Sequence, residues 1–315
     1  MSNITIGVIG YGYWGPNIVR NFFNAPNCTV KAVADGRPER LAVLAKVFPS
    51  INGVKTGEEI INDKEIDAVV VATPVYTHFA LAKKALENGK HVLIEKPITS
   101  TVAQAEELIE LAEKKGLTLM ADHTFLYTGA VQKMKELIDT DVVGTPRYFD
   151  SSRINLGLFQ PDVNVLWDLA PHDISILTYL VTELPLSINA TGISHTRNNI
   201  ENIAYMTVNY NSDFIAHFNC SWTSPVKVRQ TLIGGDKKMI VYNDLEPSEK
   251  VRVYDTSYQH KTDDEKTTIM VDYRTGDVYI PKIQLSEALA GVANDFIQSI
   301  IHKTKPLANA HLGMQ

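Results

Sequence analysis

The stretch ITIGVIGYGYWG, residues 4–15, decides the fold of this chain. Its first half predicts a β-strand, and the residues that follow it predict a helix. Between the two, Gly10, Gly12 and Gly15 have the spacing GxGxxG. In this context the first glycine makes a tight turn, the second lets the backbone approach a diphosphate, and the third lets the helix pack closely on the strand. The helix N-terminus adds N–H groups and the positive end of its dipole, so the stretch predicts a dinucleotide site.

An acidic residue at the end of the next strand supports this prediction. Asp35 follows the predicted strand 29–34 and stands 20 residues after Gly15. A carboxylate there accepts hydrogen bonds from the adenosine ribose and repels a 2′-phosphate, which favours NAD over NADP. Arg37 lies close enough to favour the phosphate instead, so NADP stays open as the second choice. A glycine turn that binds no nucleotide is the remaining alternative.

The first 122 residues alternate short apolar runs with helical patterns. Continuous apolar strands between amphipathic helices indicate a parallel sheet covered on both faces, and right-handed crossovers make it doubly wound. We therefore predict an α/β chain whose residues 1–122 form a Rossmann domain that binds NAD(P). The predicted strands are 4–9, 29–34, 68–72, 91–94 and 117–121, and the predicted helices are 16–23, 38–48, 79–88 and 102–115.

The order of predicted elements changes from residue 123 onward, where many short β-like segments follow one another. Gly, Asn and Asp separate them, as in 211–213 and 234–236. This pattern predicts a C-terminal α+β domain over 123–315 with a large, open, mostly antiparallel sheet and a helix on one face. We assign the last helix, 287–301, to this domain, with packing on the first domain as the alternative. The other predicted helices are 130–138 and 170–181, and the strands are 147–154, 187–194, 204–209, 214–222, 228–233, 239–242, 251–254 and 268–273.

Composition argues against several classes of protein. Thirty Lys and Arg against 36 Asp and Glu give a net charge of −6, and no basic stripe is visible, which argues against nucleic-acid binding. Cys28 and Cys220 are far apart and are expected to be free thiols. The histidines lack metal-ligand spacing, so no metal site is predicted. No apolar run reaches about 18 residues and no leader pattern is present, so we expect a cytoplasmic protein without a membrane segment.

Three further motifs point to one family. Thr73-Pro74 follows a buried strand and precedes His78, Glu95-Lys96-Pro97 follows the next strand, and residues 167–173 read WDLAPHD. With these motifs the chain resembles the glucose–fructose oxidoreductase, inositol dehydrogenase and rhizopine-catabolism (Gfo/Idh/MocA) family from residue 4 to about 305. The last motif resembles the family's Asp-x-Gly-x-His pattern.

The match to that pattern has two departures. Ala170 replaces the usual glycine, and Ser175 stands where the family has a later aspartate. We therefore carry over Asp168 and His172 and give Asp173 no role.

The resemblance implies a fold, a site and an assembly. It implies a Rossmann domain followed by a domain with an open sheet through which members form dimers or tetramers, and an active site between the domains that faces the nicotinamide. It also implies a cis peptide before Pro97 and catalytic roles for Lys96, Asp168 and His172. The residues expected to bind the cofactor are Gly10, Gly12, Tyr13, Trp14, Gly15, Asp35, Arg37, Thr73, Pro74, His78, Glu95 and Lys96.

The residue types suit an alcohol oxidation. Lys96 follows an apolar strand, where a cation can stabilise charge on a substrate oxygen. Pro171 suits the first turn of a helix, which would place His172 near a helix N-terminus whose dipole keeps the imidazole neutral, as a general base requires. Asp168, four residues earlier, would position the substrate or His172. The alternatives are a surface ion pair for Lys96, a capping role for Asp168 and a packed His172.

Three residues are candidates for contact with a polar substrate. Tyr127 follows the domain junction, and Arg153 and Asn155 lie at the end of the strand before the WDLAPHD motif. Ordinary polarity of a strand surface is the alternative for them.

These expectations lead to one predicted function and two rivals. The prediction is an NAD-dependent oxidoreductase that transfers a hydride between a nicotinamide and a secondary alcohol of a sugar, an inositol or a sugar nucleotide. A sugar nucleotide is included because the sequence resembles UDP-N-acetylglucosaminuronate 3-dehydrogenases. The first rival is a keto-sugar reductase in a biosynthetic pathway. The second is a nucleotide-sensing regulator, which would not need the Lys96, Asp168 and His172 set. The expected partners are a small sugar-like substrate and further copies of the chain, as a homodimer or homotetramer.

Overall fold

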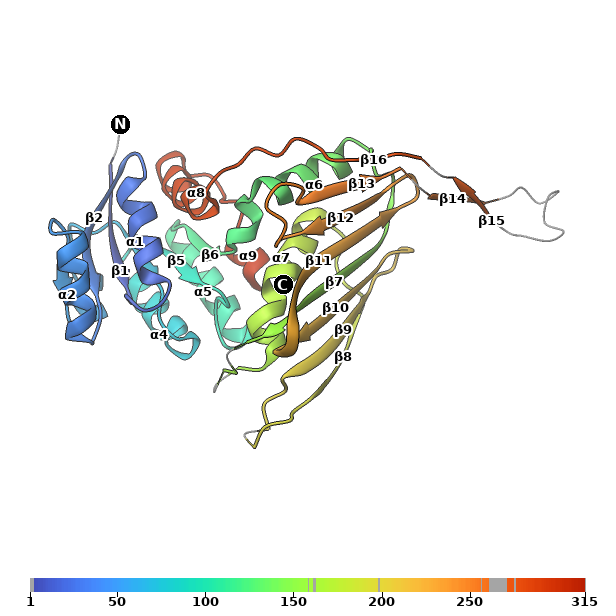
Figure 1. Cartoon of the computed structure of the whole chain (residues 1–315). Helices are drawn as coiled ribbons and strands as arrows, with labels where there is room; N and C mark the ends of the chain where they lie inside the picture. Colours follow the sequence, from blue (N-terminus) through green and yellow to red (C-terminus); the bar gives the residue numbers. More distant parts are fainter. Residues whose placement is uncertain are drawn as a thin grey trace. The chain divides into compact units, whose positions relative to one another are not determined.

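The computed structural model forms two compact units (Figure 1). It describes residues 3–157, 159–160, 163–197, 199–255, 257–260, 271–274 and 276–314. Residues 1–128 and 286–315 make the first unit, and residues 129–285 make the second. This division differs from the expected boundary at 122/123, because the chain returns to the first unit after residue 285.

The first unit contains a six-stranded parallel sheet in the order β3-β2-β1-β4-β5-β6. This order is that of a doubly wound nucleotide-binding fold, and it confirms the predicted Rossmann domain. The order reverses between β1 and β4, where such sheets bind their ligands. The strands are β1 (Ile4–Ile9), β2 (Cys28–Ala34), β3 (Asn52–Val54), β4 (Ala68–Val71), β5 (His91–Glu95) and β6 (Leu119–Asp122), and the helices between them are α1 (Gly15–Asn24), α2 (Pro38–Val47), α3 (Gly57–Ile61), α4 (Val75–Glu87) and α5 (Val102–Lys115).

The apolar runs form the central strands because both faces of the sheet are buried. All four residues of β4 are buried, and so are three of the five in β5. Two elements between β2 and β4 were not predicted from the sequence. Strand β3 has three residues, which is too short for a periodic signal, and α3 has five, although Thr56 and Glu59 form a capping box at its start.

The C-terminal segment packs on the first unit. Helix α8 (Ala288–His302) places Phe296 edge-on against Phe22 of α1, with ring centroids 6.2 Å apart. Asp295 of α8 accepts a 2.6 Å hydrogen bond from the hydroxyl of Tyr127 in the short 3₁₀ helix η1 (Thr124–Tyr127). Beyond α8, α9 (Ala310–Met314) lies against β6. The alternative placement of the last helix, on the first domain, is therefore the one observed.

The second unit contains an eight-stranded sheet in the order β16-β13-β12-β11-β7-β10-β9-β8. Only the pair β7–β10 is parallel, so the predicted mostly antiparallel sheet is confirmed. Its strands are β7 (Pro146–Leu156), β8 (Ser187–Ile193), β9 (Ile203–Asn209), β10 (Ile215–Ser221), β11 (Thr223–Gly235), β12 (Met239–Asn243), β13 (Val251–Tyr254) and β16 (Val278–Tyr279), its helices are α6 (Gly129–Asp139) and α7 (Val165–Leu180), and β14 (Ser257–His260) pairs with β15 (Val271–Arg274) separately. Part of the predicted strand 268–273 lies outside the described residues.

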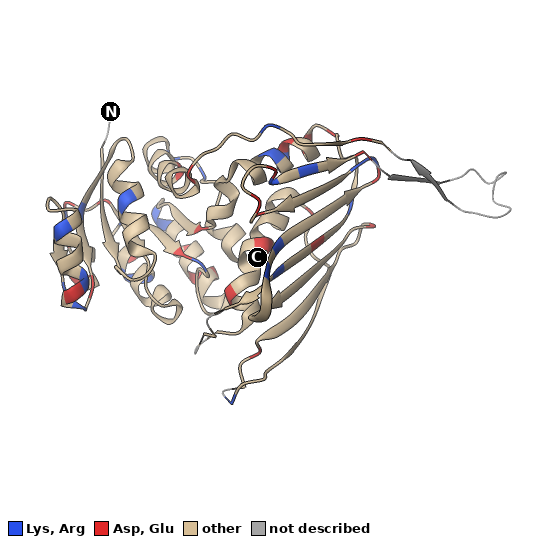
Figure 2. Cartoon of the chain, in the orientation of Figure 1, with Lys and Arg blue, Asp and Glu red and all other residues tan. Residues whose placement is uncertain are grey.

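The two faces of this sheet differ. Helix α7 covers one face, where Val165 and Ala170 pack with Trp222 in a buried apolar cluster. On the opposite face, Tyr205 and Ile215 are each 46% exposed. Strands β8, β9 and β10 contain no Lys, Arg, Asp or Glu and are tan throughout in Figure 2. An uncharged and partly apolar sheet face is thus open within this unit.

Candidate active site

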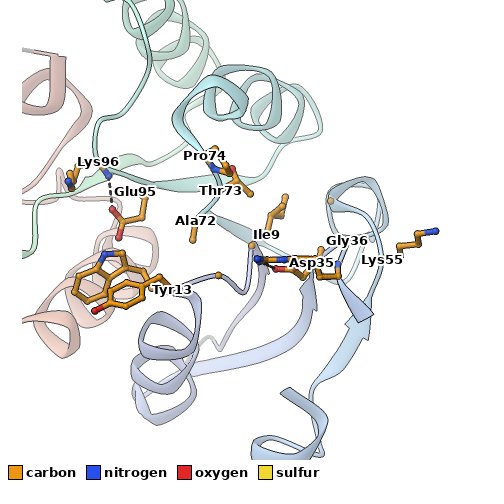
Figure 3. A pocket seen from close by; sticks show the side chains of 16 residues that line it. Ile9, Tyr13, Asp35, Gly36, Lys55, Ala72, Thr73, Pro74, Glu95 and Lys96 are labelled. Carbon is orange, nitrogen blue, oxygen red and sulfur yellow. Dashed lines mark hydrogen bonds and ion pairs between the residues drawn. The ribbon is translucent and has the colours of Figure 1, made fainter. Parts of the chain in front are cut away.

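A cavity of about 630 Å³ lies at the carboxyl ends of the central parallel strands, entirely within the first unit (Figure 3). It occupies the place where the strand order reverses, as expected for a doubly wound sheet. Ten of the twelve residues predicted to bind the cofactor line it, and Gly15 and His78 do not. The lining residues are Ile9, Gly10, Gly12, Tyr13, Trp14, Ala34, Asp35, Gly36, Arg37, Lys55, Gly57, Ala72, Thr73, Pro74, Glu95 and Lys96.

The glycine loop forms the middle of the cavity wall. Gly10 has φ +104°, and a Cβ on it would lie 2.3 Å from the carbonyl oxygen of Ala72. A Cβ on Gly15 would lie 2.7 Å from the carbonyl oxygen of Gly10, so close packing of α1 on the strand requires glycine there. A Cβ on Gly12 would meet only Arg37, at 3.7 Å. A side chain at Gly12 would therefore project into the cavity, and the bare backbone leaves that space for a diphosphate.

Asp35 stands at one end of the cavity and is saturated with hydrogen bonds. Its carboxylate accepts them from the backbone N–H groups of Tyr11 (2.9 Å) and Arg37 (3.0 Å). The Arg37 guanidinium adds two more, from Nε (2.9 Å) and Nη2 (2.8 Å). This guanidinium lowers the pKa of Asp35 to about 2, so the group is ionised at neutral pH. A carboxylate has about four acceptor positions, and all are used here.

Lys55 belongs to the same end of the cavity and was missed from the sequence (Figure 3). It follows β3, and the backbone N–H of Asp35 binds the carbonyl oxygen of Val54 in that strand. The signal that would have found Lys55 is its place directly after a strand. That strand is too short to recognise by pattern.

Glu95 and Lys96 form the other end of the cavity. Glu95 Oε2 accepts a 2.9 Å hydrogen bond from the backbone N–H of Lys96, drawn dashed in Figure 3. The Lys96–Pro97 peptide is cis, as the resemblance implies. Behind this wall the buried His78 ring lies 2.7 Å from the carbonyl oxygen of Thr73 and 2.9 Å from that of Pro97. His78 thus ties together two turns that line the cavity rather than lining it itself.

Helix α7 in the second unit carries the other predicted catalytic residues, and its start differs from the expectation. Asn164 caps it by accepting a hydrogen bond from the N–H of Trp167 at 3.1 Å. Pro171 is therefore inside the helix, and His172 is its eighth residue. The prediction that His172 lies near a helix N-terminus is wrong. Because the dipole acts mainly within the first turn, it does not explain a neutral His172.

The neighbours of His172 are held by buried contacts. Asp168 accepts a 3.0 Å hydrogen bond from the indole N–H of the buried Trp222. Asp173, to which no role was given, binds Arg153 through two 2.7 Å hydrogen bonds, and each side chain is only 3% exposed. Arg153 therefore joins β7 to α7. Its proposed contact with substrate stays a prediction.

The other two substrate candidates also stay predictions. The hydroxyl of Tyr127 donates to Asp295 and accepts from the N–H of Ala308 at 3.2 Å. Asn155 is partly buried near the end of β7. The polar group of Tyr127 thus has structural partners in the first unit.

The described parts of the chain contain no group of three or more His, Cys, Asp or Glu side chains arranged to hold a metal ion. Within the same residues, no helix has the length and apolar character to cross a membrane.

Comparison with protein-family models identifies both halves of the chain. Residues 4–123 match the oxidoreductase family model with an NAD-binding Rossmann fold, and residues 131–241 match the C-terminal domain model of the same family. The chain belongs to the Gfo/Idh/MocA oxidoreductase family. The first match covers the cavity and all twelve residues predicted to bind the cofactor, and the second covers Asp168 and His172.

Two curated Gfo/Idh/MocA-like relatives resemble the chain over part of their length. One is the uncharacterized oxidoreductase YdgJ of Escherichia coli, 34% identical over 60% of this chain and 56% of the relative. The other is UDP-N-acetylglucosamine 3-dehydrogenase of Acidithiobacillus ferrooxidans, 31% identical over 66% of this chain and 64% of the relative. The matched region thus spans less than two thirds of either relative.

Solved structures resemble the whole fold. That of the Acidithiobacillus enzyme has a TM-score of 0.81 and 24% identity, covering 100% of this chain and 94% of the other. Levoglucosan dehydrogenase, in complex with NADH and levoglucosan, has a TM-score of 0.82 and 21% identity with the same coverage. At these identities the likeness supports the Gfo/Idh/MocA fold alone.

Proposed function

We propose that this chain is an NAD-dependent oxidoreductase acting on a secondary alcohol of a sugar, a sugar nucleotide or an inositol. The observation that carries the proposal is the cavity where the strand order reverses, with Asp35 at one end, the glycine loop in the middle and Lys96 at the other end. This order of groups matches the order of an adenosine ribose, a diphosphate and a nicotinamide riboside along an extended NAD molecule.

The residues present fit this cofactor. Asp35 is an ionised acceptor for the ribose hydroxyls, and the open space at Gly12 accepts the diphosphate. Arg37 must give up part of its contact with Asp35 when a ribose binds, since the carboxylate has no spare acceptor position. Tyr13, which is 86% exposed, offers ring surface beside the Glu95 end (Figure 3). The ring of Trp14, which is 48% exposed, lies edge-on to that of Tyr13 with the centroids 5.6 Å apart.

The chemistry is divided between the cofactor and the chain. Bound NAD supplies the acceptor for a hydride. Lys96 donates a hydrogen bond to the substrate oxygen and stabilises the negative charge that develops there. His172 accepts the hydroxyl proton, and Asp168, held by Trp222, positions the substrate or His172. The proposal requires Lys96 and His172 to act on one substrate, although they belong to different units.

The substrate class rests on the relatives. One is named as a 3-dehydrogenase of a nucleotide-linked sugar, and a structure of similar fold is a complex with NADH and the anhydro-sugar levoglucosan. A polyhydroxylated ring is common to both. The same residues run in reverse would reduce a keto-sugar, so direction is decided by measurement and not by the site.

A substrate panel tests the proposal. The purified chain and NAD⁺ are mixed in separate reactions with sugars, with inositols and with UDP- or dTDP-sugars. NADH formation is followed by absorbance. We expect turnover with at least one class, and loss of it in Lys96→Met. The chain could bind NAD but neither oxidise any of the alcohols nor reduce the matching ketones with NADH. That result would favour a nucleotide-sensing regulator. Absence of NAD binding would overturn the proposal.

A further inference from the structure

Two carboxyl groups lie side by side at the Lys96 end of the cavity. Strands β5 and β6 are parallel neighbours, and their register pairs Glu95 with Asp122. Paired residues of adjacent strands project from the same face of a sheet. Glu95 is partly buried and lines the cavity, whereas Asp122 is 2% exposed and lies behind it.

Few donors compensate these two groups. Glu95 accepts the backbone N–H of Lys96, and Asp122 Oδ1 accepts a 2.8 Å hydrogen bond from the hydroxyl of Thr124. The second oxygen of Asp122 is buried and accepts no hydrogen bond from the described residues. A buried carboxylate with one donor is poorly stabilised, and a second carboxylate beside it makes the ionised pair still less favourable.

Four other titratable groups belong to this neighbourhood. Lys96 is the cation, and its charge favours ionisation of both carboxyls. His123 follows Asp122, and burial lowers its pKa to about 4, so it adds no positive charge at neutral pH. Tyr127 of η1 and Asp295 of α8 are bonded to each other. One lysine therefore faces two carboxyls.

The balance of these effects leaves one proton on the two carboxyls at neutral pH. Burial and the neighbouring Asp122 raise the pKa of Glu95 to about 8, and burial raises the pKa of Asp122 to about 6. Interacting acids titrate as a pair, so two steps near these values belong to Glu95 and Asp122 together. Between the steps the pair carries one proton and one negative charge.

We propose that Glu95 and Asp122 form an acid pair that holds one proton beside the nicotinamide position and releases it to solvent when the cationic ring of NAD⁺ binds. The inference rests on the proposed function, which places the nicotinamide at the Glu95 end of the cavity. Glu95 faces the ring, and Asp122 is a positioning residue that acts through Glu95. The ring of NADH is uncharged, so its binding leaves the proton in place.

This linkage has a measurable consequence for cofactor binding. Because NAD⁺ binding expels a proton, its affinity rises with pH by up to about tenfold per pH unit below the upper step of the pair. NADH affinity has no such slope from this pair. Raising the pH therefore shifts the cofactor preference toward the oxidised form without any change in contacts.

Proton release on binding is the direct test. Apoprotein in weakly buffered solution with a pH indicator is mixed with NAD⁺ or NADH near pH 7.5, while binding is followed by protein fluorescence. We expect release with NAD⁺ alone, and no release in Glu95→Gln, which imitates the protonated acid. Asp122→Asn removes the neighbouring charge and should move the release to lower pH. Glu107→Gln, an exposed acid of α5 paired with Lys83, is the matched control.

The outcomes separate this inference from the proposed function. Binding of NAD⁺ with equal proton release for both cofactors, or with full release in Glu95→Gln, overturns the acid pair and leaves the proposed function standing. Failure of both cofactors to bind overturns the proposed function itself. If Glu95→Gln does not fold, infrared titration of the wild-type apoprotein replaces it: a protonated carboxyl band that persists above pH 6 and disappears near pH 8 is expected, and its absence refutes the pair.

Discussion

The guanidinium of Arg37 binds the carboxylate of Asp35 through two parallel hydrogen bonds, Nε to Oδ1 at 2.9 Å and Nη2 to Oδ2 at 2.8 Å. Both residues line the cavity, at the end assigned to the adenosine ribose. The negative charge expected to reject a 2′-phosphate is thus paired with a cation, and Lys55 brings a second cation to the same end. The preference for NAD over NADP should therefore be moderate and should depend on Asp35.

Replacement of Asp35 by Ala tests this dependence. The change removes the acceptor for the ribose hydroxyls and should weaken NAD binding by about 1–3 kcal/mol. It also frees the guanidinium of Arg37 from its carboxylate partner, so the gap in affinity between NAD and NADP should narrow. Dissociation constants of both cofactors, measured by titration calorimetry, give the answer. An unchanged preference in Asp35→Ala would contradict the assignment of this end to the ribose.

The catalytic assignment predicts separate effects on turnover and on binding. His172→Ala should lower turnover by about 10²–10⁴-fold, the usual contribution of general base catalysis, because no other group is assigned to take the hydroxyl proton. NAD affinity should stay the same, since the cavity belongs wholly to the first unit. Lys96→Met should also depress turnover. The exposed His302→Ala serves as control, and loss of NAD binding in His172→Ala would point to a structural role instead.

Local sequence patterns were sufficient to predict the parallel sheet and most of the residues that line the cavity. Gly10, Gly12 and Asp35 could be assigned because each does its work at a fixed distance along the chain from a strand or a helix start. Lys55 could not be assigned, because the strand that precedes it has only three residues and shows no alternation of apolar and polar residues. Asn164 was likewise not recognised as a helix cap. Because it caps α7, the helix begins at Val165 and not at residue 170, and His172 is therefore not near the helix N-terminus.

The second limit on prediction from the sequence is that hydrogen-bond partners can be far apart along the chain. Arg153 is a substrate candidate because it lies on the strand before the WDLAPHD motif, and Tyr127 because it follows the predicted domain junction. Their partners, Asp173 and Asp295, are 20 and 168 residues away. Nothing local indicates that folding brings these pairs together. The pairing of Glu95 with Asp122 is of the same kind, since it follows from the register of two strands.

The ion pair between Arg153 and Asp173 should be important for stability. Both side chains are 3% exposed and are joined by two hydrogen bonds. Asp173→Asn leaves a buried guanidinium without its counter-charge and should cost about 3–5 kcal/mol in urea unfolding. Glu107→Gln, which breaks an exposed pair with Lys83, should cost less than about 1 kcal/mol. Equal costs for the two changes would show that the buried pair is dispensable.

The raised pKa of Glu95 predicts a pH dependence of stability with a definite sign. In the folded chain the pair of Glu95 and Asp122 keeps one proton up to about pH 8, whereas in the unfolded chain both acids lose their protons near their ordinary pKa values. The folded state therefore binds more protons between these values, and the free energy of unfolding falls as pH rises through them. Glu95→Gln cannot titrate and should flatten this slope, with urea unfolding at pH 5, 6.5 and 8 as the measurement. An identical slope in wild type and variant would contradict the raised pKa.

The exposed, partly apolar face of the second sheet predicts self-association. On β9 and β10, Tyr205 and Ile215 are each 46% exposed, and Tyr148 of β7, which pairs with Ile215, is 37% exposed. An exposed and largely apolar surface on a sheet is typical of an interface, so we expect a homodimer or homotetramer that buries it. Ile215→Asp places a charge in that surface and should yield a 35.0 kDa monomer by light scattering, while Val43→Asp, at an exposed position on α2, should leave the oligomer intact. A wild-type chain that is monomeric at working concentration would refute the interface.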